Sequence, residues 1–389
     1  MIPSEIPQVT FGMIVLNGEP FLRYNLRGLY PFAKRIVVVE GADPAAAFLA
    51  SADGHSRDGT LEVLGDFKRR EDPEGKVVVV TAEDHGYSDG FWPGEKDEQS
   101  RAYWSRAIGD WLWQVDVDEF YHPEDIRRIL EYLTGHGDVT CLAFNAYHFW
   151  GGFEYLIDGG KYWSIHFAGE PHGAIRRVFR WNPDYRYRTH RPPTIVDVTG
   201  QNITRRCLLN ATTRIGVRMY HYSMVLPSQM REKAEYYQRK GWSSAKGMAA
   251  ETERLIEEVD IRSGIRIWKQ MGYHNWLEPF RGQHPPGIRD LIRDIDAGDF
   301  PVKLRRVDDI ESLLGSSEYR RRTRLLRVLE RFRSLCSLIH YRGRLWSHCC
   351  KGILRRAGGP LIERLPMPMA VRGWLRESGL GHRPDKSLP

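Results

Sequence analysis

The segment Trp111-Leu112-Trp113-Gln114-Val115-Asp116-Val117-Asp118-Glu119-Phe120 decides how the chain is interpreted. It begins as an apolar run typical of a buried strand and ends with two carboxylates that are two residues apart. Side chains at positions i and i+2 of an extended chain point to the same side, so Asp116 and Asp118 are expected to act together. Two such carboxylates suit a hard divalent cation, Mn²⁺ or Mg²⁺, which in turn can bind the phosphates of a nucleotide.

A second triplet of this kind, Asp294-Ile295-Asp296, has a different interpretation. It lies within a predicted helix, Ile288–Ala297, where residues i and i+2 do not share a face. We therefore interpret it as solvated helix surface.

Outward from the acidic segment, short β-branched runs alternate with helical patterns. Strands are predicted at Val9–Leu16, Arg35–Glu40, Lys76–Thr81 and Trp111–Val115. Helices are predicted at Glu19–Tyr30, Asp58–Phe67, Lys96–Ile108 and Pro123–Leu133. This alternation predicts an α/β fold with a mostly parallel sheet covered by helices on both faces.

The rest of the chain changes character twice. Residues 138–224 are rich in aromatic residues and glycine, and we expect irregular strands and loops there. Helices are then predicted at Pro227–Lys240, Ala245–Glu258, Ile261–Met271 and Ile288–Ala297. We expect a catalytic domain at 1–243 (halves about 8–135 and 136–243), a helical connector at 244–315 and a basic amphipathic helical tail at 316–389.

The net charge of +7 is distributed unevenly over the 389 residues. The tail has 17 Lys and Arg against 5 Asp and Glu, a net charge of +12, which leaves −5 for the first 315 residues. General polyanion binding by the main body is therefore not indicated. No apolar run reaches the roughly 20 residues of a membrane span, and neither a signal peptide nor a disulfide framework is indicated, so we expect a cytoplasmic protein.

Polar residues also follow the other predicted strands. Asn17-Gly18-Glu19 follows the first strand and Glu40 ends the second. Open α/β sheets bind ligands at the carboxyl ends of their strands, so these residues are expected near Asp116. The segment Ser56-Arg57-Asp58-Gly59-Thr60 precedes a helix, and by itself it indicates only capping and turn chemistry.

Together, Met13–Glu19, Ile36–Glu40, Ser56–Thr60 and Asp116–Phe120 resemble, in order and approximate spacing, the bacterial family-2-like glycosyltransferases with the GT-A fold. The resemblance implies a Rossmann-type sheet and hexosyltransferase-like, inverting transfer from a nucleotide-diphosphate sugar to an acceptor hydroxyl. It also implies a role in cell-envelope or surface glycan synthesis, with a glycan or lipid-linked acceptor.

The resemblance assigns roles to residues of the first half. Nucleotide-sugar contacts are implied for Asn17, Glu19, Glu40, Asp58, Lys96 and Asp116. Asp118 is implied to bind the Mn²⁺ or Mg²⁺ ion directly, and Asp116 is implied to contact the metal or the ribose. Here Glu40 stands where Asp is more usual, and the insertion Asp43–Asp53 separates it from Ser56. For Lys96, exposed helix charge is preferred over phosphate contact.

The second half is expected to supply the base and the acceptor site. His221, in Tyr220-His221-Tyr222-Ser223 after the strand-like run Ile215–Met219, is predicted as a third metal ligand, with a hydrogen-bonded core histidine as the alternative. Base or acceptor contacts are predicted for His190, Asp197 and Glu170. Aromatic residues of Tyr147–Trp163 either stack on sugar rings or fill the core. For Arg176, Arg177 and Arg180, pairing with surface acids is preferred over diphosphate binding.

The basic tail indicates contact with an anionic membrane surface, on the inner face of the plasma membrane, or packing on the catalytic domain. No nucleic-acid-binding module is recognised, so nucleic acid is not expected as a partner. Two other functions stay open: a non-catalytic GT-A-like protein that binds a nucleotide or glycan, and a membrane-associated scaffold.

Overall fold

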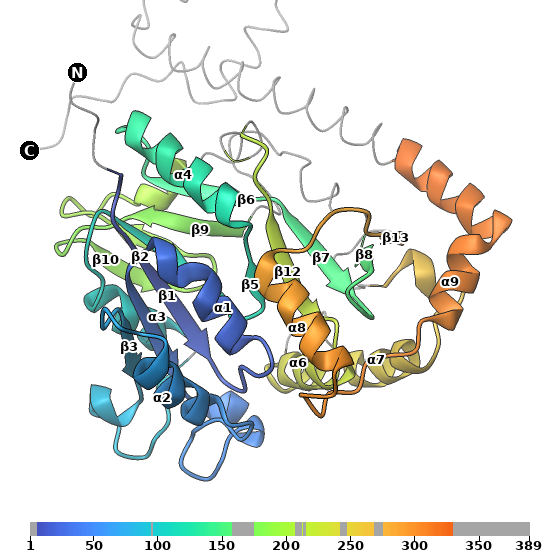
Figure 1. Cartoon of the computed structure of the whole chain (residues 1–389), viewed down its shortest axis with the longest axis horizontal. Coiled ribbons are helices and arrows are strands. Elements are labelled where there is room, and N and C mark those ends of the chain that lie inside the picture. Colours follow the sequence, from blue (N-terminus) through green and yellow to red (C-terminus); the bar gives the residue numbers. More distant parts are fainter. Residues whose placement is uncertain are drawn as a thin grey trace, which may run out of the picture. The chain divides into compact units, whose positions relative to one another are not determined.

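The computed structural model describes residues 6–94, 96–157, 175–206, 212, 215–241, 247–267 and 275–329. The chain divides into two units, and the larger one, residues 1–165 and 170–327, contains every element named below (Figure 1). In the described residues, no helix is both long enough and apolar enough to cross a membrane. The predicted role of the tail falls almost entirely outside the described residues.

The main sheet has six strands. Their order is β3 (Val77–Val80), β2 (Ala33–Glu40), β1 (Val9–Val15), β4 (Trp111–Gln114), β9 (Ile175–Arg180) and β6 (Cys141–Phe144). The first four are parallel to one another, and β9 is antiparallel to both of its neighbours. The predicted α/β fold with a mostly parallel sheet is therefore confirmed, and all four predicted strands are present.

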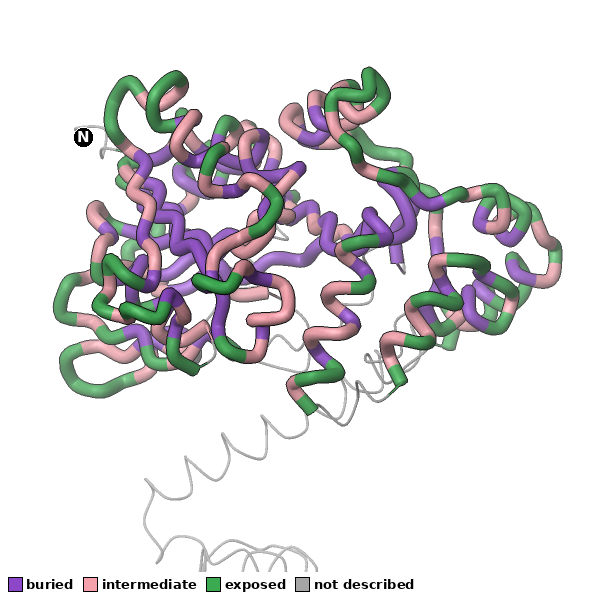
Figure 2. Tube along the Cα trace, turned by 90° about the horizontal axis from the view of Figure 1, so that it is seen from below, coloured by how far each residue is buried: buried purple, intermediate pink, exposed green. Residues whose placement is uncertain are grey.

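Helices cover both faces of this sheet because its strands are apolar on both sides. Val9, Phe11, Met13 and Val15 alternate along β1 toward helices α1 (Leu22–Leu29), α2 (Thr60–Arg70) and α4 (Pro123–Gly135). The opposite face packs on α3 (Asp97–Ser105) and on the hairpin of β10 (Arg186–Thr189) and β11 (Thr194–Val196). Strands β1 and β4 are buried throughout, and in Figure 2 the exposed residues concentrate on the outer turns of the trace.

A second, five-stranded sheet lies beside the first. Its order is β13 (Leu277–Pro279), β8 (Tyr155–Ile157), β7 (Ala146–Trp150), β12 (Met219–Met224) and β5 (Glu119–Phe120). An aromatic core that includes Phe149 and Tyr222 joins it to α1 and α8 (Pro286–Asp296). A further core, around Trp150 and Met224, joins it to α6 (Pro227–Arg239), α7 (Met248–Glu257) and α9 (Asp308–Gly315). The described aromatic residues from Tyr147 to Tyr155 thus lie in strands and loops and pack in or against these cores.

Two sequence-based predictions of secondary structure are wrong. The helix expected at Ile261–Met271 is absent from its described residues, 261–267, which form turns and a short 3-10 helix at Ser263–Ile265. The strand expected at Ile215–Met219 begins only at Met219, so Tyr220–Ser223 lie within β12 and do not follow it. Asp294 lies on α8, as predicted for the second acidic triplet, and accepts a hydrogen bond from the Tyr24 hydroxyl.

Candidate functional site

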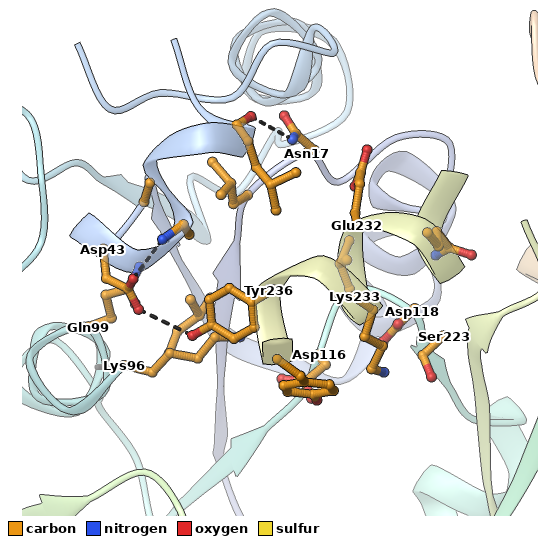
Figure 3. A pocket seen from close by; sticks show the side chains of 18 of the residues that line it. Asn17, Asp43, Lys96, Gln99, Asp116, Asp118, Ser223, Glu232, Lys233 and Tyr236 are labelled. Carbon is orange, nitrogen blue, oxygen red and sulfur yellow. Dashed lines mark hydrogen bonds between the residues drawn. The ribbon is translucent and has the colours of Figure 1, made fainter. Parts of the chain in front are cut away.

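The central cavity, about 400 Å³ in volume, opens at the carboxyl ends of β1, β2 and β4. The chain proceeds from β1 outward to β2 and β3, and it returns to place β4 on the other side of β1. This reversal of strand order creates a crevice where α/β sheets bind ligands. Strands β7 and β12 of the second sheet and helix α6 complete the wall (Figure 3).

The acidic turn after β4 forms the floor of the cavity. Asp116 and Asp118 both line it and are partly buried. The backbone N–H of Tyr222 donates to the Asp118 carbonyl at 2.9 Å, which ties the turn to β12. The two sheets therefore meet at the residues that carry the carboxylates.

A buried guanidinium neutralises Asp116. Arg177 of β9 donates from Nη2 to Asp116 Oδ2 at 2.9 Å and from Nε to Glu119 Oε2 at 2.7 Å. Burial alone would raise the pKa of Asp116, but the charges of Arg177 and Lys96 hold it well below its usual range. The sequence interpretation of Arg177 as a partner of surface acids is wrong, since its partners are internal and its own side chain is buried.

Asp118 lies next to a pair of histidines. His221 Nε2 is 3.6 Å from Asp118 Oδ1, and His221 Nδ1 is 3.1 Å from His148 Nδ1 of β7. Burial would raise the pKa of Asp118, but the charge and hydrogen bond of His221 lower it. Asp116, Asp118 and His221, which were predicted as metal ligands, thus all line one cavity.

Positive charge also surrounds the acidic turn. Lys96, Arg191 and Lys233 line the cavity together with Tyr237. Burial would raise the pKa of Tyr237, but the charges of these three cations lower it below its ordinary value. The cations therefore converge closely enough to stabilise an anion, which is what a bound diphosphate requires. The preferred sequence interpretation of Lys96 as exposed helix charge is wrong, because this side chain is partly buried at the cavity wall.

The side chains of Asn17 and Glu40 both bind loop residues, and of the two only Asn17 lines the cavity. Asn17 lines the cavity in a left-handed conformation (φ 54°), which Asn tolerates better than most residues. Its side-chain amide donates to the Leu49 carbonyl at 3.0 Å and accepts from the Arg57 N–H at 2.8 Å. Glu40 is fully buried, its oxygens are bound by Ser56 and His55, and it does not line the cavity.

Glu19 and Asp58 belong to a capping arrangement outside the cavity. Asp58 Oδ2 accepts from the Glu19 N–H at 2.8 Å, and Asp58 Oδ1 accepts from the Thr60 hydroxyl at 2.6 Å. Burial and the nearby charge of Asp58 raise the pKa of Glu19 to about 7, against the opposing charge of Arg23. Neither acid is among the residues that line the cavity.

None of the described base candidates lines the cavity either. His190 is buried, with Nδ1 2.8 Å from the Ser100 hydroxyl and its N–H bound to Asp97. Asp197 caps a tight turn by accepting from Thr199 and Gln201. Glu170 lies outside the described residues. His190 is therefore a hydrogen-bonded core residue and Asp197 a turn cap, and neither contacts the cavity.

Helix α6 supplies wall residues that the sequence interpretation missed. They recur on one helix face at a spacing of three and four: Gln229, Glu232, Lys233, Tyr236 and Tyr237. The sequence could have revealed this helix face from the spacing alone. A polar stripe along a predicted helix indicates a face that contacts either solvent or a ligand. His148, Arg191 and Gln99 were also missed, and no motif marks them.

The insertion after β2 lines the cavity beside α6. It forms the 3-10 helix η2 (Pro44–Leu49), which Asp43 begins by accepting from the N–H groups of Ala45 and Ala46. Figure 3 shows Asp43 and Tyr236 pointing toward each other, and the Tyr236 hydroxyl is 3.3 Å from Asp43 Oδ2. Arg239 of α6 also lies over the Phe48 ring, at 4.0 Å. The insertion and α6 are thus fastened together as one wall.

No family model matches the chain, and no curated protein matches it in sequence. Among solved structures, glucosyl-3-phosphoglycerate synthase from Mycobacterium tuberculosis with Mn²⁺, UDP and glucosyl-3-phosphoglycerate is 15% identical, with a TM-score of 0.27, over 37% of this chain and 45% of that one. S. aureus TarS 1-349 with UDP-GlcNAc is 13% identical, with a TM-score of 0.28, over 44% and 45%. TarS 1-349 alone is 12% identical, with a TM-score of 0.32, over 68% and 79%.

The chain matches less than half the length of the first two of these structures. Because the identities and TM-scores are low, the function proposed below rests on the residues of the cavity.

Proposed function

We propose that this protein is a glycosyltransferase that moves a sugar from a nucleotide-diphosphate donor to an acceptor hydroxyl. The supporting observation is the convergence of Asp116, Asp118 and three cations in one cavity at the reversal of strand order. Carboxylates suit a metal–nucleotide complex, and the cations Lys96, Arg191 and Lys233 can offset the charge that develops on a leaving diphosphate. The sequence resemblance to family-2-like enzymes supports an inverting outcome.

We propose Mn²⁺ or Mg²⁺ as the metal. Within the described part of the chain, no three His, Cys, Asp or Glu side chains form a ready-made cation site. Asp118 and His221 nevertheless fit one side of a hard or borderline cation, since such ions are often held by one or two carboxylates plus substrate phosphates and water. Bound there, the metal would supply positive charge to the diphosphate. Asp116 is already neutralised by Arg177 and fits ribose contact equally well.

A ligand screen tests this proposal. Thermal shift of the full chain with nucleotide diphosphates, with and without Mn²⁺, should show stabilisation that needs both components, because a ligand of the native state raises its stability. Turnover of nucleotide-sugars is then expected for the wild type and lost in Asp118→Asn. Binding without any turnover of a broad donor and acceptor panel would favour the non-catalytic binding function.

For the tail we propose contact with an anionic membrane surface, which would place the enzyme at the inner face of the plasma membrane beside a lipid-linked acceptor. The supporting observations are the tail's net charge of +12 and three exposed apolar side chains at its start, Leu325, Val328 and Leu329. Co-sedimentation of the full chain with anionic vesicles, and not with neutral ones, is expected. Undiminished binding by a chain ending at Gly315 would exclude the tail.

A further inference from the structure

Four carboxylates line the cavity, and three of them are already bound. Asp43 accepts from two backbone N–H groups and lies 3.5 Å from the Lys240 ammonium. Asp116 is paired with Arg177 at 2.9 Å. Asp118 lies 3.6 Å from His221. The charges of Arg177 and His221 lower the pKa values of Asp116 and Asp118, so these two carboxylates have less capacity to accept a proton. The Asp43 carboxylate is engaged by its N–H donors and the Lys240 ammonium.

The fourth carboxylate, Glu232, is different. It lies one turn into α6, lines the cavity and is half-buried. Among the described residues, its side chain forms no hydrogen bond and no ion pair. In Figure 3, Glu232 and its neighbour Lys233 diverge, and Lys233 points toward Asp118 and Ser223. One turn of helix thus presents a cation near the acidic turn and a separate, available carboxylate.

The surroundings of Glu232 make its carboxylate a stronger base than an exposed one. Burial raises its pKa above the ordinary value, and the negative charge of Asp58 adds to this shift. The histidines on the wall are less available, because His148 and His221 are bound to each other at 3.1 Å. Burial also lowers the pKa of His148 well below its ordinary value. A general base needs a free lone pair within reach of the substrate and a pKa nearer the working pH.

We propose that Glu232 is the general base of the transfer, an assignment that rests on the proposed function. The acceptor hydroxyl oxygen forms a bond to the anomeric carbon of the donor, and its proton passes to the Glu232 carboxylate. The bond from the anomeric carbon to the phosphate oxygen breaks, and its electron pair leaves with the nucleotide diphosphate. The cations on the wall stabilise that leaving group, and Glu232 releases its proton to solvent before the next turnover.

The chain offers a matched control on the same helix. Glu235 is one turn further along, does not line the cavity, and pairs with Arg239 at the surface. Glu232→Gln is expected to lower kcat by about 10²–10⁴-fold, the usual contribution of a general base. Its affinity for the nucleotide diphosphate should stay unchanged. Glu235→Gln should keep wild-type kcat, because exposed ion pairs contribute little.

The pH profile separates a base from a structural residue. Wild-type kcat should fall as the pH drops through the raised pKa of Glu232, whereas the residual activity of Glu232→Gln should lack that limb. Glu232→Asp should retain the limb with a reduced kcat. The melting temperature of Glu232→Gln should equal or exceed that of the wild type, since folding disfavours the charged carboxylate.

Each outcome decides one of two questions. Wild-type kcat or an unchanged pH limb in Glu232→Gln would overturn the assignment of the base, and so would equal losses in Glu232→Gln and Glu235→Gln. A wild-type protein that turns over no nucleotide-sugar would instead overturn the proposed function.

Discussion

The Nδ2 atom of Asn25 lies 2.8 Å from the carbonyl oxygen of Val117, so a buried residue of α1 holds the acidic turn from inside the body. The same amide donates to the Glu119 carbonyl at 2.8 Å. Asn is a weak helix former because its side chain competes for backbone groups. Its position within an eight-residue helix is thus explained by the turn that it supports and not by the helix itself.

Asn25→Leu should therefore destabilise the protein. The carbonyl oxygens would lose their donor without gaining access to water, a cost of about 1–3 kcal/mol. Denaturant unfolding would measure this loss, and affinity for nucleotide diphosphates should fall with it. Gly28→Ala on the same helix is the control, since the added Cβ has no atom within 4 Å beyond its chain neighbours and helix backbone, and Ala favours a helix. Equal stability of the two variants would contradict the prediction.

Arg177→Met should have a larger effect than a surface ion-pair variant. It would leave the fully buried Glu119 carboxylate without its cation, and breaking a buried pair costs about 3–5 kcal/mol. Combining it with Glu119→Leu should recover part of this loss, because the fully buried carboxylate is then removed as well, whereas the partly buried Asp116 still lacks its cation. Denaturant midpoints of the single and double variants test the pair. A double variant as unstable as Arg177→Met alone would show that packing dominates over charge.

Stability should fall in acid because the folded protein holds the pKa values of Asp116 and Asp118 below their ordinary range. A depressed carboxyl pKa contributes stability that is present above the unfolded pKa of about 4 and is lost as the pH falls toward the folded pKa. Urea unfolding at a series of pH values would measure this slope. Asp116→Asn should flatten it, and a slope equal to that of the wild type would argue against the contribution of Asp116.

Gly12→Ala should disturb the packing of α3 on the sheet. A Cβ on Gly12 would lie 2.7 Å from Cδ2 of the buried Tyr103 ring, closer than real contacts allow. Overpacking of this kind costs about 1–3 kcal/mol. If the clash is the cause, the double variant with Tyr103→Leu should lose less stability than the two single variants together. Strict additivity would assign the loss to another cause.

The main sheet could be predicted because each of its first four strands is a compact apolar run flanked by an amphipathic helix. The failure at residues 261–267 has a local cause. Asp260 Oδ1 accepts from both the N–H and the hydroxyl of Ser263, at 2.7 and 2.6 Å. This side chain offers the backbone a tight turn in competition with a helix, and apolar spacing does not reveal the competition.

Parts of the cavity could also be predicted, because a residue at the carboxyl end of a parallel strand lies at a known edge. That argument places Asn17 and Asp116 at the wall, but it does not show whether a side chain is available to a ligand. Both carboxylate oxygens of Glu40 are occupied by hydrogen bonds to Ser56 and His55, which follow the insertion in the sequence. Glu232 could not be singled out, since its availability depends on which neighbouring acids have found partners.

The wall formed by α6 has a consequence for synthesis of the protein. The cavity joins Asn17, near the start of the chain, to Tyr237 on α6. A nascent chain still lacking α6 can pair β1 with β2 and β4, yet it has only one side of the ligand site. Ligand binding at the cavity would therefore require a chain that has been synthesised at least through α6, which ends at Arg239, about 90 residues before the larger unit ends at Arg327.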